Sequence, residues 1–264
     1  MIDILIFTYN RPLYLKRSID YWSRSKFNII IADGSKNFFK YPFPSNFKYF
    51  HLPDTTMLYR VLFLSKKSKH DYLVFCADDD FHSFDALKNI CTFLKKNKDY
   101  ACAQGMYLRV GQKTNQKSLL LGAAYLNSIS EDTKKLNLKK KDLLTKFVKM
   151  NYPICYAVMR NSVMKDFVKF FDGLDLKNSL TGKVSIQLIE DLTYYAVFLN
   201  GHYVTLPLFY SLRQNQIQSY ASIYNDKLFL NDIFADWVNN NGSEWQLVKK
   251  NIQTLIKEKF HFNF

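Results

Sequence analysis

Glycine, proline and cysteine are scarce in this chain of 264 residues. Eight glycines and six prolines disfavour many short strands joined by tight turns, so we expect an α/β or helical fold. The four cysteines lack C-x-x-C spacing, which argues against a zinc site or a disulfide framework and predicts reduced, buried thiols. We see no signal peptide, and no run of about 18 apolar residues long enough to span a bilayer.

Positive charge is in excess. Lysine and arginine number 37 against 23 acidic residues, which gives a formal net charge of +14. A field of this size attracts polyanions, whether nucleic acid, anionic lipid or a phosphorylated substrate. Hydrophobic residues make up 48% of the chain, enough for a sizeable globular core.

The first hundred residues alternate between short apolar runs and longer segments with apolar residues three or four apart. This pattern is typical of βαβ units, so we predict an α/β fold with a mostly parallel sheet flanked by helices. Asn10 is the expected cap of the first helix. The predicted strands are Ile2–Phe7, Asn28–Ala32, Phe47–His51 and Tyr72–Cys76, and the predicted helices are Arg11–Trp22, Thr56–Lys67 and Phe84–Lys95.

The second half of the chain is less regular. Residues 111–141 are polar and lysine-rich, which indicates excursion loops, and the tail is helical in pattern. The predicted strands here are Ala101–Val110, Tyr156–Met159 and His202–Leu206, and the predicted helices are Ser162–Phe171, Ile186–Asn200, Tyr224–Val238 and Glu244–Lys259.

Three consecutive carboxylates, Asp78, Asp79 and Asp80, follow the fourth predicted strand. Ligands of α/β sheets bind outside the carboxyl ends of the strands, and clustered carboxylates suit a hard divalent cation held together with substrate phosphates. The alternative is a solvated acidic turn at the start of the helix near Ser83.

Two more polar clusters follow predicted strands. Thr8-Tyr9-Asn10-Arg11 comes after the first strand and Asp33-Gly34-Ser35 after the second, so both are expected at the same sheet edge as the aspartates. Each also fits an ordinary turn or helix cap.

In this order, the three motifs resemble the landmarks of GT-A glycosyltransferases of the family 2 type. Tyr156-Ala157-Val158-Met159-Arg160 and the pair Glu190-Asp191 extend the similarity. The resemblance implies a GT-A domain over residues 1–212, with a nucleotide-sugar-binding half (1–110) and an acceptor-side half (111–212), followed by a helical C-terminal region (213–264).

The resemblance also implies roles for individual residues. Asp33 would accept a hydrogen bond from the nucleobase, and Thr8 would line the same pocket. Asp78 and Asp80 would hold Mn²⁺ or Mg²⁺ at the diphosphate, although three aspartates in a row leave Asp79 able to take either place. Other candidates for donor binding are Tyr9, Asn10, Arg11, Gly34, Ser35, Arg60, Lys69 and Arg213, and the four cations among them also fit ordinary surface residues.

Asp191, with Glu190 beside it, would be the general base that deprotonates the acceptor hydroxyl for an inverting displacement. The alternative for this pair is the exposed first turn of a helix that begins near Gln187.

We therefore expect a metal-dependent glycosyltransferase acting on a glycan or lipid-linked acceptor of a surface polysaccharide. The donor would be a nucleoside diphosphate sugar, UDP favoured and GDP possible by the chemistry of Asp33. The alternatives are nucleotidyl transfer and non-enzymatic nucleic-acid binding. Nucleotidyl transfer explains the first loop less well, and nucleic-acid binding explains the carboxylates less well. A cytoplasmic location is expected, with lysines of the 134–149 segment able to meet an anionic membrane.

Overall fold

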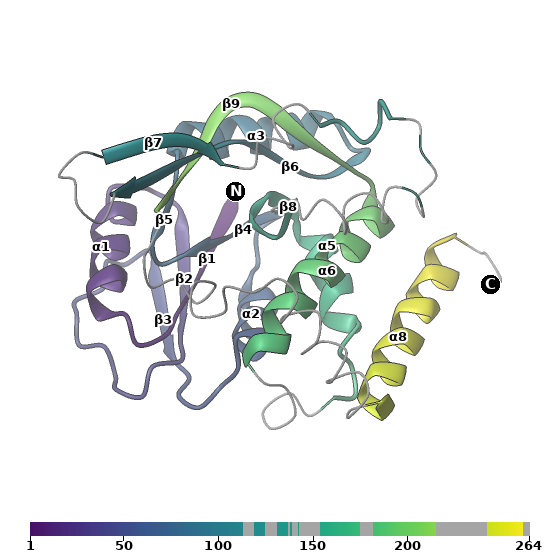
Figure 1. Ribbon diagram of the computed structural model, residues 1–264, viewed down its shortest axis with the longest axis horizontal. Helices are drawn as coiled ribbons and strands as arrows, with labels where there is room; N and C mark the ends of the chain where they lie inside the picture. The colour runs from purple at the N-terminus through teal and green to yellow at the C-terminus, as the bar shows by residue number, and fades with distance from the viewer. Residues whose placement is uncertain are drawn as a thin grey trace.

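The computed structural model describes residues 1–112, 119–124, 131–136, 138, 142, 154–174, 182–214 and 242–260. Its centre is a nine-stranded mixed sheet of order β3-β2-β1-β4-β8-β6-β9-β5, with β7 paired to β6 (Figure 1). The strands are β1 (Ile2–Thr8), β2 (Asn28–Asp33), β3 (Phe47–His51), β4 (Tyr72–Ala77), β5 (Asp80–His82), β6 (Tyr100–Gln112), β7 (Leu119–Ala124), β8 (Val158–Arg160) and β9 (His202–Gln214).

Six of the nine strands run in one direction, and β5, β7 and β8 oppose them. The mixed, mostly parallel α/β sheet predicted from the periodicity is therefore confirmed. Helices lie on both sides of it (Figure 1). They are α1 (Pro12–Trp22), α2 (Met57–Lys67), α3 (Phe84–Lys96), α5 (Asn161–Lys169), α6 (Gly182–Asn200) and α8 (Gly242–Phe260), with a 3₁₀ turn η2 (Ile154–Tyr156).

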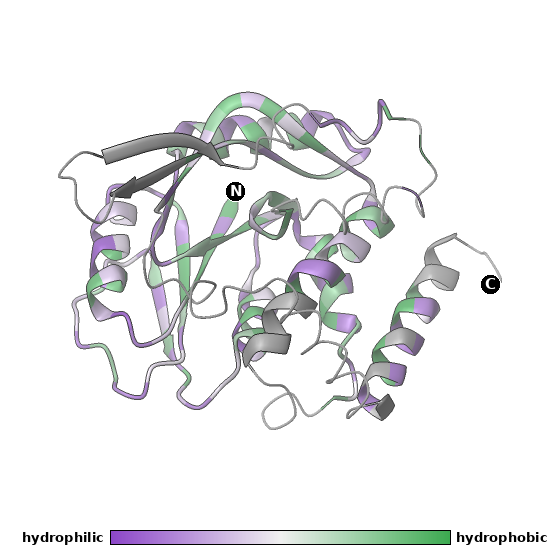
Figure 2. Cartoon of the chain, viewed as in Figure 1, coloured by the Kyte–Doolittle hydropathy of each residue, from purple (hydrophilic) through white to green (hydrophobic). Residues whose placement is uncertain are grey.

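The central strands are apolar on both faces because each face carries a helical layer (Figure 2). Leu5 of β1 belongs to the core shared with α2, α5 and α6, whereas its neighbours Ile4 and Ile6 belong to the core shared with α1 and α3. This alternation follows from the two-residue period of a strand. The hydrophobic runs that predicted these strands are thus the middle layer of the molecule.

The C-terminal helix packs on this framework. Val248, Ile252 and Leu255 of α8 are buried in the core shared with α5 and α6, and Asn251 donates from Nδ2 to the carbonyl of Phe170. Strand β9 continues to Gln214, beyond the domain limit expected at residue 212. The predicted helix Tyr224–Val238 and most of the predicted loop region 111–141 lie outside the described residues.

Two expectations about helix ends are wrong. Arg11, and not Asn10, occupies the N-cap position of α1, because Asn10 takes a left-handed backbone conformation with φ of 54°. Helix α6 begins at Gly182, so Glu190-Asp191 lies in its middle and not in a first turn. The dipole explanation for that acidic pair is therefore excluded.

The expectations about thiols and lysines have different outcomes. All four cysteines are free thiols; Cys76, Cys102 and Cys155 are buried, whereas Cys91 is only half-buried, unlike the prediction. Of the lysines that could meet anionic lipid or simply face solvent, Lys134 pairs with Asp99 and Lys135 pairs with Asp132. The others, Lys139, Lys140, Lys141, Lys146 and Lys149, lie outside the described residues. In the part of the chain that the structure describes, no helix is both long and apolar enough to cross a membrane.

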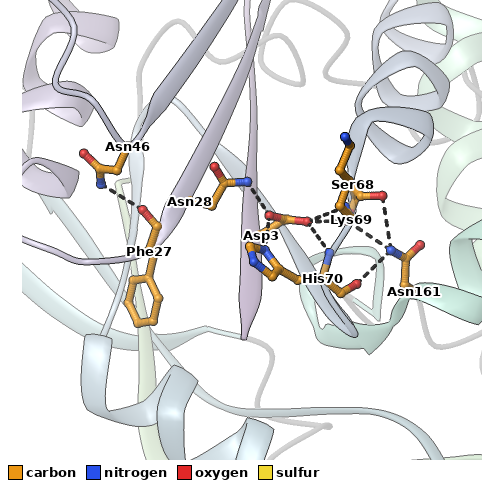
Figure 3. A network of polar contacts seen from close by, with 8 residues as sticks. All are labelled: Asp3, Phe27, Asn28, Asn46, Ser68, Lys69, His70 and Asn161. Atoms are coloured by element: carbon orange, nitrogen blue, oxygen red, sulfur yellow. Dashed lines mark hydrogen bonds and ion pairs between the residues drawn. The ribbon is translucent and has the colours of Figure 1, made fainter.

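A buried carboxylate joins the amino ends of β1, β2 and β4. Asp3 accepts hydrogen bonds from Asn28 Nδ2 (2.5 Å) and from Ser68 Oγ (2.8 Å). The backbone nitrogens of Lys69 and His70 and the His70 ring complete its shell (Figure 3). Burial alone would raise the pKa of Asp3, but these donors outweigh it and the pKa is lowered.

We expect Asp3→Asn to lower the free energy of unfolding at neutral pH by about 2–3 kcal/mol, because hydrogen bonds to a charged group are lost. A carboxyl with a lowered pKa stabilises the fold above its unfolded pKa, and that stability is lost as the pH falls through its folded pKa. The variant should therefore lose less stability than wild type on acidification. Urea unfolding at several pH values measures the free energy of unfolding. Asp85→Asn, at an exposed position of α3, is the control. An equal decrease in the free energy of unfolding in both variants would contradict the structural role of Asp3.

Candidate active site

The carboxyl ends of three parallel strands bring the predicted motifs together. Thr8 at the end of β1 is in register with Asp33 at the end of β2, and Phe7 is in register with Ala77, the last residue of β4 before the aspartates. β9 runs in the same direction, and Arg213 near its end is the backbone partner of Asp80. The sheet therefore gathers carboxylates and an arginine along one edge.

The aspartates are not a solvated turn. Asp78 and Asp80 are each only 2% exposed. Asp78 accepts a hydrogen bond from Thr8 Oγ1 at 2.6 Å and one from Arg11 Nη1 at 2.7 Å, and Arg11 Nη2 reaches Asp79 at 3.0 Å. Burial raises the pKa of Asp78 to about 6, although Arg11 and Thr8 act in the opposite direction.

The alternative explanation of the triplet, as a cap of α3, is excluded. Asp80 starts β5, and Ser83 is the residue that caps α3, with its side chain accepting from the backbone nitrogen of Ala86. The short strand β5 was not predicted. It places Asp80 against β9 instead of leaving it in a loop.

The donor set suits a hard divalent cation, with one restriction. Among the residues that the structure describes, no three His, Cys, Asp or Glu side chains gather into a metal-binding cluster. Carboxylate oxygens are nevertheless the ligands that Mg²⁺ and Mn²⁺ prefer, and Mg²⁺ is commonly held by one or two carboxylates together with substrate phosphates. Asp78 and Asp80 fit that arrangement, in which the substrate completes the coordination.

The Asp33 loop is fixed by a set of short contacts. Asp33 accepts from the backbone nitrogen of Ser35 at 2.8 Å and from the Tyr49 hydroxyl at 2.7 Å. Ser35 Oγ accepts from the backbone nitrogen of Asn10 at 2.7 Å, which ties this loop to the end of β1. The Arg60 guanidinium packs directly against Gly34, in the space that a Cβ at this position would occupy.

Arg60 lies beside the Asp33 loop, whereas Lys69 lies at the other edge of the sheet. The Arg60 guanidinium lies 5.7 Å from the centre of the Tyr9 ring, in a cation–π contact beside Gly34. Lys69 lies at the amino ends of β1 and β4, where its backbone nitrogen donates to Asp3 (Figure 3). The expectation that Lys69 binds the donor is therefore wrong.

Glu190, the first residue of the acidic pair of α6, lies beside β1 and β4. Glu190 lines a small, mainly apolar pocket together with Phe7, Phe75 and Tyr156. Burial raises the pKa of Glu190 to about 7; Arg213 lowers it and Asp191 raises it further. Arg213 lies over the Tyr156 ring at 5.2 Å. A carboxyl with a pKa near neutrality is suited to proton transfer.

Sequence reasoning missed Tyr49 and His51. Tyr49 donates to Asp33, and the His51 ring nitrogen Nε2 lies 2.7 Å from the carbonyl oxygen of Ser35. Both belong to β3, which pairs with β2 and ends beside Asp33. Their spacing of two residues on one strand is the signal that they share a face.

Known proteins share this architecture. The 1–349 fragment of S. aureus TarS in complex with UDP-GlcNAc has a TM-score of 0.58 at 13% identity, covering 98% of this chain and 73% of that one. The same fragment in complex with UDP has a TM-score of 0.52 at 13% identity, covering 92% and 72%. At such low identity the likeness concerns the fold. No curated protein sequence matches the chain significantly.

The fold and the site define a GT-A-like enzyme. Residues 3–167 match the family described as Glycosyl transferase family 2, so the chain belongs to that family. It is a glycosyltransferase that uses a nucleotide sugar, and nucleotidyltransfer and simple nucleic-acid binding fall away as explanations.

We expect Tyr49→Phe to raise the KM for the donor nucleotide sugar about tenfold while kcat changes little, because the loss of one hydrogen bond to a carboxylate releases Asp33 from its fixed orientation. Steady-state kinetics with varied donor concentration measures both constants.

Tyr41→Phe is the matched control, since the Tyr41 hydroxyl donates to Asp20 at 2.7 Å, outside the Asp33 loop. An equal rise in KM for both variants would show that Tyr49 acts only through general stability.

Proposed function

We propose that this protein transfers a sugar from a UDP-sugar to a hydroxyl group of a surface-glycan acceptor of the capsule or lipopolysaccharide type. The observation that carries the proposal is the convergence of Thr8, Asp33 and Asp78 at the carboxyl edge of one sheet. Glu190-Asp191 supplies candidate proton acceptors from α6.

The nucleotide half of the donor would be held by the first two loops. Asp33 would accept from an imide N–H of the base, and Thr8, Tyr9, Asn10, Gly34 and Ser35 would line the pocket. The Tyr9 ring is exposed at the surface, which leaves a face free for stacking on a base. UDP is favoured because the similar TarS fragment carries UDP-GlcNAc; GDP remains the second choice.

The diphosphate would lie beside the aspartates. Asp80 and Asp78 would hold Mn²⁺ or Mg²⁺, which when bound neutralises charge on the departing diphosphate. Arg11, Arg60 and Arg213 would supply further positive charge, and Asp79 would stay paired with Arg11. Asp78 already forms an ion pair with a cationic group, the guanidinium of Arg11.

The acceptor would approach from the side of α6. Asp191 would take the proton of the acceptor hydroxyl, and the oxygen would displace the diphosphate in line, inverting the anomeric carbon. Glu190, buried beside Asp191, would set the charge around the base. A lipid-linked acceptor would fit the net charge of +14, so the protein would lie at the cytoplasmic face of a membrane, with no nucleic-acid partner.

We expect Asp80→Asn to abolish the stabilisation that UDP and Mn²⁺ together give to wild type. Ligand at about 100 times its Kd adds about 2.7 kcal/mol, or roughly 5–10 °C in Tm for a chain of this size. Thermal unfolding with UDP, GDP, CDP or ADP, each with and without Mn²⁺, measures it.

Asp78→Asn and Asp79→Asn, run in parallel, decide which neighbour of Asp80 shares the metal, and Asp85→Asn is the surface control. No Tm shift of wild type with any nucleotide would overturn the metal-dependent donor site.

We expect Asp191→Asn to lower kcat by about 10²–10⁴ while donor binding stays near normal, because a general base is removed. Glu190→Gln should lower kcat less, because the general base is kept and only its buried neighbour changes. Near-normal turnover of Asp191→Asn with a large loss in Glu190→Gln would assign the base to Glu190 instead.

A further inference from the structure

An exposed rim with both apolar and basic side chains lies along the carboxyl edge of the sheet. It consists of one face of α1 and of the segment that follows β2, and its members are Leu13, Lys16, Arg17, Lys36, Phe38 and Lys40. We propose that this docking rim binds the surface of an anionic lipid membrane.

Two large apolar side chains project from the rim into solvent. Leu13 is 80% exposed and Phe38 is 56% exposed, although most large apolar residues of the described chain are buried. The Phe38 ring stands edge-on against Tyr49 and His51, at centroid distances of 5.4 and 5.6 Å. It is therefore held in an outward position by the fold and is not a loosely placed side chain.

The two parts of the rim form one surface. The backbone nitrogen of Lys36 donates to Asn10 Oδ1 at 3.4 Å, just before α1. Farther along the helix, the Tyr41 hydroxyl donates to Asp20 at 2.7 Å, and Lys16 lies 5.3 Å from the centre of the Tyr41 ring. The helix and the segment are thus fastened together at both ends of the rim.

The charge of this surface is one-sided. Residues 12–20 and 36–41 contain the cations Lys16, Arg17, Lys36 and Lys40 and a single acid, Asp20, a net charge of +3. Asp20 is already held by Lys16 at 2.7 Å. Leu13, Lys16 and Arg17 lie three and four residues apart, so they share one face of α1.

This combination fits a lipid surface better than a protein or a nucleic acid. Cations near an anionic bilayer are attracted to its headgroups, and apolar side chains among them enter the interface. A stable protein interface needs a continuous complementary area of about 1,000 Å², whereas Leu13 and Phe38 are separate projections. Nucleic acid would neutralise the cations but would leave Leu13 without a favourable contact.

Docking by this rim would also present the candidate active site to the membrane. Arg11, which bridges Asp78 and Asp79, lies over the Tyr14 ring at 4.1 Å, and Arg17 of the rim lies over the same ring at 5.0 Å. Only this consequence, access to a lipid-linked acceptor, rests on the proposed function. The membrane contact itself does not.

Sedimentation with vesicles tests the proposal, using the full chain without nucleotide or metal. Wild type should bind vesicles of equimolar phosphatidylcholine and phosphatidylglycerol and should not bind vesicles of phosphatidylcholine alone. The double variant Leu13→Ser/Phe38→Ser should lower the partition coefficient at least about tenfold, because two apolar contacts are lost. Lys36→Glu/Lys40→Glu should lower it by at least about as much.

Two control variants match these changes elsewhere on the surface. Phe209→Ser removes an apolar side chain that is 45% exposed on β9, and Lys95→Glu/Lys96→Glu makes the same charge change at the end of α3. Both should bind like wild type, and the Tm of every variant checks folding. Equal binding to both vesicle types, no binding to either, or equal loss in the controls would overturn the proposal. Because no donor is present, each of these results is independent of the test of glycosyl transfer.

Discussion

The contact of Arg11 with Asp78 joins the ends of the two strands on which the site depends. Arg11 follows β1, Asp78 follows β4, and Thr8 Oγ1 binds the second oxygen of the same carboxylate. A buried carboxylate in low dielectric is strongly destabilising without such partners. The parallel pairing of β1 with β4 brings the groups to one edge, and the ion pair then fixes the two loops against each other. The end of β1 and the aspartates after β4 are thereby held together.

The buried carboxylates at the two ends of the central strands differ in their hydrogen-bond partners and in the direction of their pKa shifts. At the amino edge, Asp3 receives donors from four residues and its pKa is lowered (Figure 3). At the carboxyl edge, the pKa of Asp78 is raised to about 6, and that of Glu190 in the nearby pocket to about 7. A fully satisfied carboxylate stabilises a fold, whereas buried carboxylates with raised pKa values are candidates for binding a ligand or transferring a proton. The carboxylate at the amino edge of the sheet is therefore structural, whereas those at the carboxyl edge are suited to binding or proton transfer.

Local patterns predicted the strands and the main motifs because those signals are short in range. Strand β3 was predicted at Phe47–His51 and observed there, and the aspartates, the Asp33 loop and the end of β1 meet as expected from sheet topology.

The features that could not be predicted depend on tertiary contacts. Strand β5 is only three residues long and exists through its pairing with β9. Lys69 was misplaced because a lysine in a loop carries no information about which edge of the sheet the loop borders. Tyr49 looks like an ordinary strand aromatic until β3 is paired with β2.

The sign of the pKa shifts links ligand binding to stability. Asp78 and Glu190 have folded pKa values above those of the unfolded chain, so each lowers the stability as the pH rises through the window between the two values. Near neutral pH, Asp78 is therefore mostly ionised at a free-energy cost that Arg11 only partly offsets, whereas Asp3 contributes stability throughout this range. A ligand that brings positive charge to Asp78 removes part of that cost, so its binding energy also stabilises the fold. For this reason the stability of the protein at neutral pH is a sensitive reporter of what occupies the carboxyl edge.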